Sequence, residues 1–157
     1  MDVALRFGEL AGSSAVAKKI AINHRVLAAG PAYLERAGCP AGSTDLPKHT
    51  VIVGPPGNSI DAWRFVLNGK VVSVRVEGRL HASVNEGAAA TAVAGLGILS
   101  TGLWGCRNEL ENGTLIRILK DWPMGMSELH AVLPDGRTAK PSARQFVEYL
   151  LSVYGDN

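Results

Sequence analysis

Apolar residues recur along the chain in two alternating patterns. Short apolar runs or strict apolar–polar alternation, which are typical of strands, occupy residues 2–7, 26–29, 51–53, 63–67, 70–78, 98–100, 115–119 and 129–133. The wider spacing of a helix occupies residues 31–37, 86–96, 103–112 and 142–154. Because strands and helices alternate in sequence, the pattern predicts an α/β fold with crossover connections.

Turn residues mark the ends of the first elements. Asn68-Gly69 separates two β-rich runs and suits the type I′ turn of a hairpin. Pro31 in the first turn and Gly38 just past the last turn bound the first helix. Residues 8–14, 39–50 and 54–59 are rich in Gly, Pro or Ser and are expected to be mostly loop.

The later helices carry cap signals of their own. Asn85 is placed to cap the second helix and Gly97 to end it. This helix carries no charge from residue 87 to residue 97, so we expect it to be buried on most sides. Ser142 and Gln145 fit a capping box at the start of the last helix. The apolar stripe of that helix consists of Phe146, Val147, Leu150, Val153 and Tyr154.

The first strand begins almost at the first residue. Val3, Leu5 and Phe7 alternate with Ala4 and Arg6, a pattern that predicts a strand packed into a core. Domains seldom begin inside a buried strand. The sequence therefore predicts that preceding segments of the fold are missing from this chain.

Composition narrows the class of protein. The 157 residues include 16 Lys plus Arg and 14 Asp plus Glu, a net charge of +2, which argues against a basic nucleic-acid tail or an acidic arm. The two cysteines, Cys39 and Cys106, lack CxxC spacing and are expected to be reduced thiols of a cytoplasmic protein. The sequence shows neither a signal-peptide pattern nor an apolar run long enough to span a bilayer.

Catalytic and metal-binding patterns are weak. Ser83 and Ser100 occur near His81, but no G-x-S-x-G motif accompanies them, so a nucleophilic enzyme is the less favoured interpretation. The four histidines are scattered without i,i+4 spacing, and GLGILSTG fits neither a P-loop nor a GxGxxG turn. We predict a protein that is not an enzyme and that carries neither a metal nor a cofactor.

The order of motifs resembles the effector-binding (substrate-binding) domain of LysR-type transcriptional regulators. The motifs that carry the resemblance are DVALRFGEL with the following Ser13-Ser14, RVLAAGPAYLERAG, TDLPKH, the WRF…NGK hairpin, VRVEGRLHASVNEGAAATAVAGLGI, NGTLIRILKDW, HAVLP and PSARQFVEYL. Each is weak alone, but eight in family order make a specific match. The segment LSTGLWG departs from the family, because Thr101-Gly102 stands where a Leu-Pro pair is usual.

The resemblance implies the fold of type 2 periplasmic binding proteins, with two α/β lobes and an effector in the cleft. Residues 1–24 and 127–157 would form lobe one, and residues 25–126 would form lobe two. The family's winged helix-turn-helix, its linker helix and the first β-α-β portion of lobe one have no counterpart, so the resemblance predicts an N-terminally truncated domain with an incomplete first lobe. We expect self-association as a homodimer or higher assembly to cover the surface that this leaves exposed.

The resemblance also places candidate effector contacts on two segments: Arg6, Phe7, Gly8 and Leu10 after the first strand, and Ser83, Val84, Asn85 and Glu86 at a helix start. The first N–H groups of a helix attract anions, and a guanidinium suits a carboxylate. The alternatives are that Asn85 only caps its own helix, that Arg6 pairs with Glu9 or another acid in solvent, and that Phe7 serves the core.

These features predict an effector-sensing module of a LysR-type regulator. Its partners would be a small anionic metabolite and a second copy of the chain, with DNA bound only through the missing N-terminal domain and no membrane. A solute-binding protein of a transport system with the same fold is the alternative.

Overall fold

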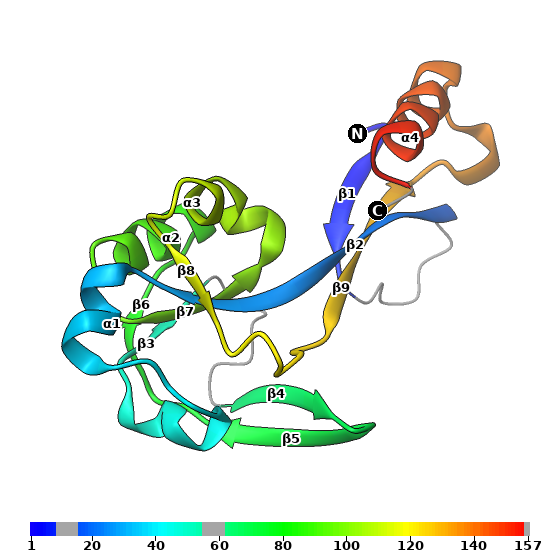
Figure 1. Cartoon of the computed structure of the whole chain (residues 1–157). Helices are drawn as coiled ribbons and strands as arrows, with labels where there is room; N and C mark the ends of the chain where they lie inside the picture. Colours follow the sequence, from blue (N-terminus) through cyan, green and yellow to red (C-terminus); the bar gives the residue numbers. More distant parts are fainter. Residues whose placement is uncertain (9–15, 55–61, 156–157) are drawn as a thin grey trace. The chain divides into compact units, whose positions relative to one another are not determined.

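The computed structural model describes residues 1–8, 16–54 and 62–155 (Figure 1). The chain divides into two compact units, Met1–Asn23 with Met126–Asn157 and His24–Gly125, called unit 1 and unit 2 below. Strand β2, Val16–Ala29, contributes its first half to unit 1 and its second half to unit 2. Most of the loops expected at residues 8–14 and 54–59 lie outside the described residues.

Unit 1 combines three strands with one long helix. Its strand order is β1 (Ala4–Phe7), β9 (Met126–Leu133) and the first half of β2, with β1 antiparallel to β9. A 3₁₀ turn, η3 (Gly136–Thr138), leads to α4 (Pro141–Tyr154), which lies along the strands (Figure 1). The buried side chains of α4 and β9 are Ala143, Val147, Leu150, Leu129, Ala131 and Leu133.

Unit 2 is a mixed sheet with a separate hairpin. The second half of β2 pairs antiparallel with β7 (Ile98–Gly102) and with β8 (Ile116–Ile118). β3 (Val51–Val53) runs parallel to both β7 and β6 (Gly78–His81). β4 (Ala62–Leu67) and β5 (Lys70–Arg75) form a two-stranded sheet of their own.

Short helices connect these strands and define two cores. They are α1 (Pro31–Ala37), η1 (Ser43–Lys48), α2 (Asn85–Val93), η2 (Leu103–Cys106) and α3 (Arg107–Glu111). On β2, Leu27 and Ala29 belong to a core with the hairpin and α1, whereas Val26 and Ala28 belong to a core with α2. Alternate side chains of β2 therefore pack into the cores on opposite faces of the sheet, as expected for a sheet covered on both sides.

Several local predictions are confirmed. Asn68 and Gly69 have φ angles of 49° and 75°, the left-handed pair that a type I′ turn requires. α1 begins at Pro31, and Gly38 adopts a φ of 79° just beyond its last residue. The described residues contain no helix that is both long and apolar enough to cross a membrane.

The cap predictions for the later helices are wrong. Asn85 is the first residue of α2 rather than its cap, which is Val84, and the turn after α2 is made by Gly95 with a φ of 76° rather than by Gly97. At α4 the cap residue is Lys140 with Pro141 at the first position, so Ser142 lies within the first turn and caps nothing. Pro141 fits this position because its fixed φ is already helical.

Some element boundaries also differ from the prediction. β2 is fourteen residues long and starts ten residues before the predicted strand. The predicted strand 70–78 divides into β5 and the separate strand β6, and the predicted helix 103–112 divides into η2 and α3. The segment 39–50, expected as loop, contains η1. Tertiary pairing decides such boundaries, because β6 is a strand only through its pairing with β3.

Burial corrects three further expectations. Leu5 and Phe7 of β1 are exposed, because β1 pairs with β9 alone among the described strands. In α4, Val147 and Leu150 are buried, whereas the rest of the predicted stripe, Phe146, Val153 and Tyr154, is exposed. In α2 the buried residues are Ala88, Ala89 and Ala92, so this helix is covered on one side rather than most sides.

Candidate functional site

The first turn of α2 presents backbone donors that no side chain caps. The first intrahelical hydrogen bond runs from the N–H of Ala88 to the carbonyl of Val84 at 3.2 Å. The N–H groups of Asn85, Glu86 and Gly87 therefore have no intrahelical acceptor, as at every helix start. The cap residue Val84 is exposed and has no side-chain oxygen with which to accept them. Together with the helix dipole, these donors make the α2 start a place where an anion is stabilised.

The side chain of Asn85 is held away from its own helix. The Thr101 hydroxyl donates to Asn85 Oδ1 at 2.6 Å, and Asn85 Nδ2 donates to the carbonyl of Gly105 at 2.9 Å. Thr101 is buried at the end of β7, and Gly105 lies in η2 directly after it. Asn85 therefore fastens the start of α2 to the end of β7 instead of capping the helix.

Gly105 permits this close approach. A Cβ atom at position 105 would lie 2.5 Å from Asn85 Nδ2 and 2.9 Å from Thr101 Oγ1, well inside van der Waals contact. No larger residue can occupy this position without moving the Asn85 amide. The hydrogen-bonded cluster of Asn85, Thr101 and Gly105, which holds the start of α2 against the end of β7, is called the α2 anchor below.

A half-buried guanidinium lies on the other side of β7. Arg25 Nη2 donates to Ser100 Oγ at 3.0 Å and to the Ser100 carbonyl at 3.2 Å, and burial lowers the pKa of Arg25. Because successive strand residues point to opposite faces, Ser100 faces away from the α2 anchor. Ser100, considered above as a nucleophile, therefore accepts a hydrogen bond from Arg25, and His81 Nε2 is bonded to the Gly78 carbonyl at 3.0 Å. This arrangement is not a Ser–His pair.

The first candidate segment lies in unit 1. Arg6 is exposed on β1 opposite His130, and no acid among the described residues pairs with it. Gly8 adopts a φ of 88°, and its N–H donates to the carbonyl of Glu128 at 3.0 Å. Phe7 is exposed and does not fill a core, and Leu10 lies outside the described residues.

The structure thus brings one set of candidates together. Ser83, Val84, Asn85 and Glu86 form one surface of unit 2, whereas Arg6, Phe7 and Gly8 belong to unit 1. Sequence reasoning did not name Thr101, Gly105 or Arg25 as part of a site. The available signal was the unusual Thr101-Gly102 pair, because a buried hydroxyl at a strand end needs a partner.

Metal-binding groups and the buried cysteine are further candidates for a site in the described part of the chain. Within residues 1–8, 16–54 and 62–155, no three His, Cys, Asp or Glu side chains are grouped to hold a metal. Burial raises the pKa of the Cys106 thiol to about 11, which keeps it protonated and unreactive near neutral pH.

Comparison with known proteins identifies the family. The family described as LysR substrate binding domain matches residues 1–155. An uncharacterized HTH-type transcriptional regulator of Haemophilus influenzae is 33% identical over 147 residues, covering 87% of this chain and 47% of that protein. An HTH-type transcriptional regulator of Xanthomonas campestris pv. campestris is 29% identical over 155 residues, covering 96% and 45%. The chain spans about half the length of these curated relatives.

Solved structures agree with this match. The regulatory domain of CrgA, a LysR-type transcriptional regulator from Neisseria meningitidis, superposes with a TM-score of 0.85 at 25% identity, covering 98% of this chain and 76% of that one. The regulatory domain of AphB from Vibrio vulnificus gives a TM-score of 0.80 at 25% identity, with coverages of 97% and 75%. The predicted fold of type 2 periplasmic binding proteins is confirmed, and the transport alternative is not favoured. The chain belongs to the LysR substrate binding domain family.

Proposed function

We propose that this chain is the effector-sensing part of a LysR-type regulator and that a small anionic metabolite binds at the start of α2. The observation that carries the proposal is the uncapped first turn of α2, whose own Asn85 side chain is engaged by Thr101 and Gly105. An asparagine that capped the helix would compete with a ligand for the same N–H groups. The α2 anchor removes this competitor and fixes the donors in place.

A charged side chain of α2 affects anion binding at the start of this helix. Glu86 is exposed in the first turn of α2, where its carboxylate already lies at the positive end of the helix dipole. A bound carboxylate would meet repulsion from Glu86, so affinity would depend on the charge at position 86. We propose Arg6, Phe7, Gly8 and Leu10 of unit 1 as further effector contacts, as the family resemblance implies, with Arg6 as a guanidinium suited to a carboxylate.

The proposal assigns the two units to the two lobes of the family fold. Unit 2 would be lobe two, residues 25–126, and unit 1 would be lobe one. Ligand binding would then be read out as a change between lobes in the longer regulator, which would bind DNA through a helix-turn-helix outside this chain. With a net charge of +2, this chain itself is not expected to bind DNA tightly at physiological salt.

A matched ligand panel tests the site. Thermal-shift measurements would compare small mono- and dicarboxylates with the corresponding neutral amides, and calorimetry would give the affinity of any compound that stabilises the chain. We expect stabilisation by carboxylates and not by their amides. The Glu86→Lys variant should bind a stabilising carboxylate roughly tenfold more tightly, since it exchanges repulsion for attraction in the first turn.

Glu35→Lys is the matched control. Glu35 is exposed on α1 in the same unit, so its replacement changes the net charge equally but far along the sequence from the α2 start. Carboxylate binding that responds equally to both substitutions would place the ligand elsewhere. Stabilisation by the amides alone would contradict an anionic effector.

A further inference from the structure

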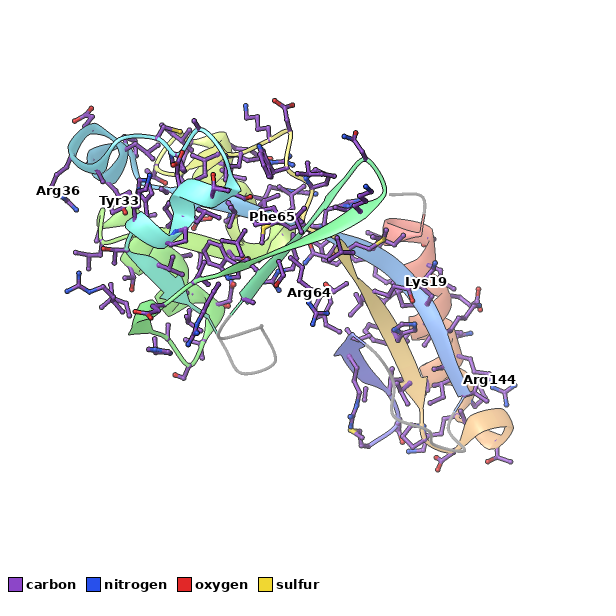
Figure 2. All side chains as sticks on the ribbon, turned by 90° about the horizontal axis from the view of Figure 1, so that it is seen from below. Lys19, Tyr33, Arg36, Arg64, Phe65 and Arg144 are labelled. Carbon is purple, nitrogen blue, oxygen red and sulfur yellow. The ribbon has the colours of Figure 1, made fainter. Side chains whose placement is uncertain are left out.

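The β4–β5 hairpin of unit 2 has one covered face and one exposed face. Trp63, Phe65 and Val74 are buried in the core of unit 2, and the residues next to them in each strand point to the other face. Figure 2 labels Phe65 and its exposed neighbour Arg64 on β4. The side chains of the exposed face, called the hairpin face below, are Arg64, Val66, Val71, Ser73 and Arg75.

The backbone of β5 offers hydrogen-bonding groups along its outer edge. Val66 of β4 donates its N–H to the carbonyl of Pro123 at 2.8 Å, so the backbone groups of Val66 point away from β5. Val71 lies opposite Val66 in the register, and the two therefore form a pair without mutual hydrogen bonds. By alternation, Val71, Ser73 and Arg75 direct their N–H and C=O groups away from β4.

This outer edge is open in the part of the chain that the structure describes. β4 and β5 form a sheet of two strands, and Figure 1 shows β5 as the outer strand of the hairpin. Within residues 16–54 and 62–125, no backbone group bonds to the outward N–H and C=O groups of Val71, Ser73 and Arg75. An edge of this kind is a template for an added strand.

Cations gather on the hairpin and on the strand that follows it. From residue 62 to residue 81 the charged side chains are Arg64, Lys70, Arg75 and Arg79 against the single acid Glu77, and all five are exposed. None of the four cations forms an ion pair with a residue that the structure describes. A partner that brings carboxylates to this surface would therefore meet cations that are not already engaged.

The hairpin face also carries an apolar pair. Val66 and Val71 are direct cross-strand neighbours next to the turn, and they are 40% and 67% exposed. Among the described residues of unit 2, no other large apolar side chain is as exposed as Val71. Arg75 lies near the opposite end of β5. A strand added along this edge would thus have an apolar neighbour at one end and a guanidinium at the other.

We propose that an extended, acidic segment of another protein binds along the outer edge of β5 as a third, antiparallel strand. Its backbone pairs with Val71, Ser73 and Arg75, and its outward side chains are an apolar residue beside Val71 and acids beside the other two. Because Ser73 is small, the carboxylate beside it can reach Arg64, which lies opposite Ser73 on β4. Read in the antiparallel direction, the partner motif is acid-x-acid-x-apolar.

The rest of the surface favours a polypeptide over a nucleic acid. Single-stranded nucleic acids are held by cations together with aromatic side chains that stack on the bases. The hairpin face contains no aromatic side chain, and Trp63 and Phe65 of β4 are buried. The open edge of β5 and the exposed pair Val66 and Val71 match instead the backbone and an apolar side chain of an added strand.

Calorimetry with synthetic peptides tests the proposal. The probe acetyl-TETETVT-amide carries the motif in the antiparallel order, and acetyl-TKTKTVT-amide reverses its charge. A third peptide is the probe N-methylated at both glutamates, which keeps the charge and removes two N–H donors that face β5. We expect the probe to bind, and the dissociation constants of the other two peptides to be at least tenfold higher.

Substitutions in the chain separate the charges from the edge. Arg64→Glu/Arg75→Glu should raise the dissociation constant of the probe at least tenfold. Arg107→Glu/Arg117→Glu makes the same change of net charge at exposed positions of α3 and β8 and should change it less than about threefold. Ser73→Pro removes an outward N–H that makes no bond to β4 and should abolish binding. Melting temperatures show whether each variant keeps its fold, and the N-methylated peptide tests the edge even if Ser73→Pro does not fold.

Glu86→Lys distinguishes this surface from the anion site proposed at the start of α2. The affinity for the probe should stay within about threefold of wild type in this variant, so either proposal can fail without the other. No binding of the probe, equal binding of its N-methylated form, or equal losses in the two double-arginine variants would overturn the proposal. Tighter binding of an oligothymidylate than of the probe at physiological salt would overturn it too, and would assign the cations to a nucleic acid.

Discussion

The two units of this chain differ in how far their aromatic side chains are buried. In unit 2, Tyr33, Trp63 and Phe65 are buried, and Trp122 packs edge-on against Phe65 with ring centroids 6.0 Å apart. Tyr33 also accepts the Thr50 N–H at 2.9 Å, and Arg36 Cζ lies 5.6 Å from the centre of its ring. Figure 2 labels Tyr33 and Arg36 close together at α1. In unit 1 every aromatic residue, Phe7, Phe146, Tyr149 and Tyr154, is exposed.

The difference follows from how many layers cover each sheet. Unit 2 has a core on each face of its sheet, one closed by α1 and the hairpin and one closed by α2. In the described part of unit 1, a single long helix lies on the strands (Figure 1). A wide apolar face needs a second layer to be buried, so the aromatic side chains of unit 1 stay exposed, whereas Tyr33, Trp63 and Phe65 of unit 2 are buried.

The largest expected effect comes from truncating one aromatic residue in each unit. Phe65→Ala should lower the free energy of unfolding by about 3–5 kcal/mol, because Phe65 is fully buried against Trp122. Phe146→Ala in unit 1 should change it by less than about 0.5 kcal/mol in a dilute, monomeric sample. Urea unfolding followed by tryptophan fluorescence reports unit 2, since Trp63, Trp104 and Trp122 all lie there, and circular dichroism of the long helix α4 reports unit 1.

Equal losses in the two variants would show that Phe146 is buried in solution. That outcome would remove the contrast between the units.

The same contrast explains how far the sequence could be interpreted. The hairpin and α1 were predictable because Asn68-Gly69 and Pro31 set backbone angles locally. The length of β2 was not, because residues 16–25 are polar or mixed and form a strand only through partners far along the chain. Periodicity identified the apolar stripe of α4, but coverage of that stripe depends on other elements.

The candidate site was predictable only in part. The start of α2 was located from Asn85 and Glu86, but the role given to Asn85 as cap was wrong. Asn85 Oδ1 is the atom that would cap the helix, and it is also the atom that accepts from the Thr101 hydroxyl. It bonds to Thr101, because this buried hydroxyl has no access to water and needs a protein acceptor. Thr101 and Gly105 lie 16 and 20 residues away, so only the fold brings them to Asn85.

Removing the Thr101 hydroxyl tests the polar interior of unit 2. Thr101→Val keeps the shape of the side chain but leaves Asn85 Oδ1 without its donor, so stability should fall by about 2 kcal/mol. Thr114→Val, at an exposed position, should change it by less than about 0.5 kcal/mol. Urea unfolding would measure both. If Thr101→Val were as stable as Thr114→Val, water would have replaced the lost donor, and the α2 anchor would be accessible to solvent.

Alkaline pH should weaken unit 2 through Cys106. The folded-state pKa of about 11 lies above the ordinary thiol pKa of 9.0, because burial disfavours the thiolate. The resulting stability is fully present below pH 9 and is lost as pH rises toward 11. The loss at pH 10 amounts to about 1.4 kcal/mol. Stability measured at pH 8 and pH 10 under reducing conditions should therefore fall less in Cys106→Ala than in wild type. Cys39→Ala, which keeps Cys106, should retain the wild-type fall.

The smallest effect is expected on the surface of unit 1. Lys18 and Glu148 join β2 to α4 at 2.7 Å, but their side chains are 46% and 67% exposed, so water and salt screen the pair. Lys18→Met should lower stability by about 0.5 kcal/mol or less, and the loss should shrink further at 1 M salt. Circular dichroism follows this change, because the fourteen-residue α4 is the longest helix described. A loss above about 1.5 kcal/mol would mean that water is excluded from the Lys18–Glu148 pair and that the surface of unit 1 is buried as fully as the core of unit 2.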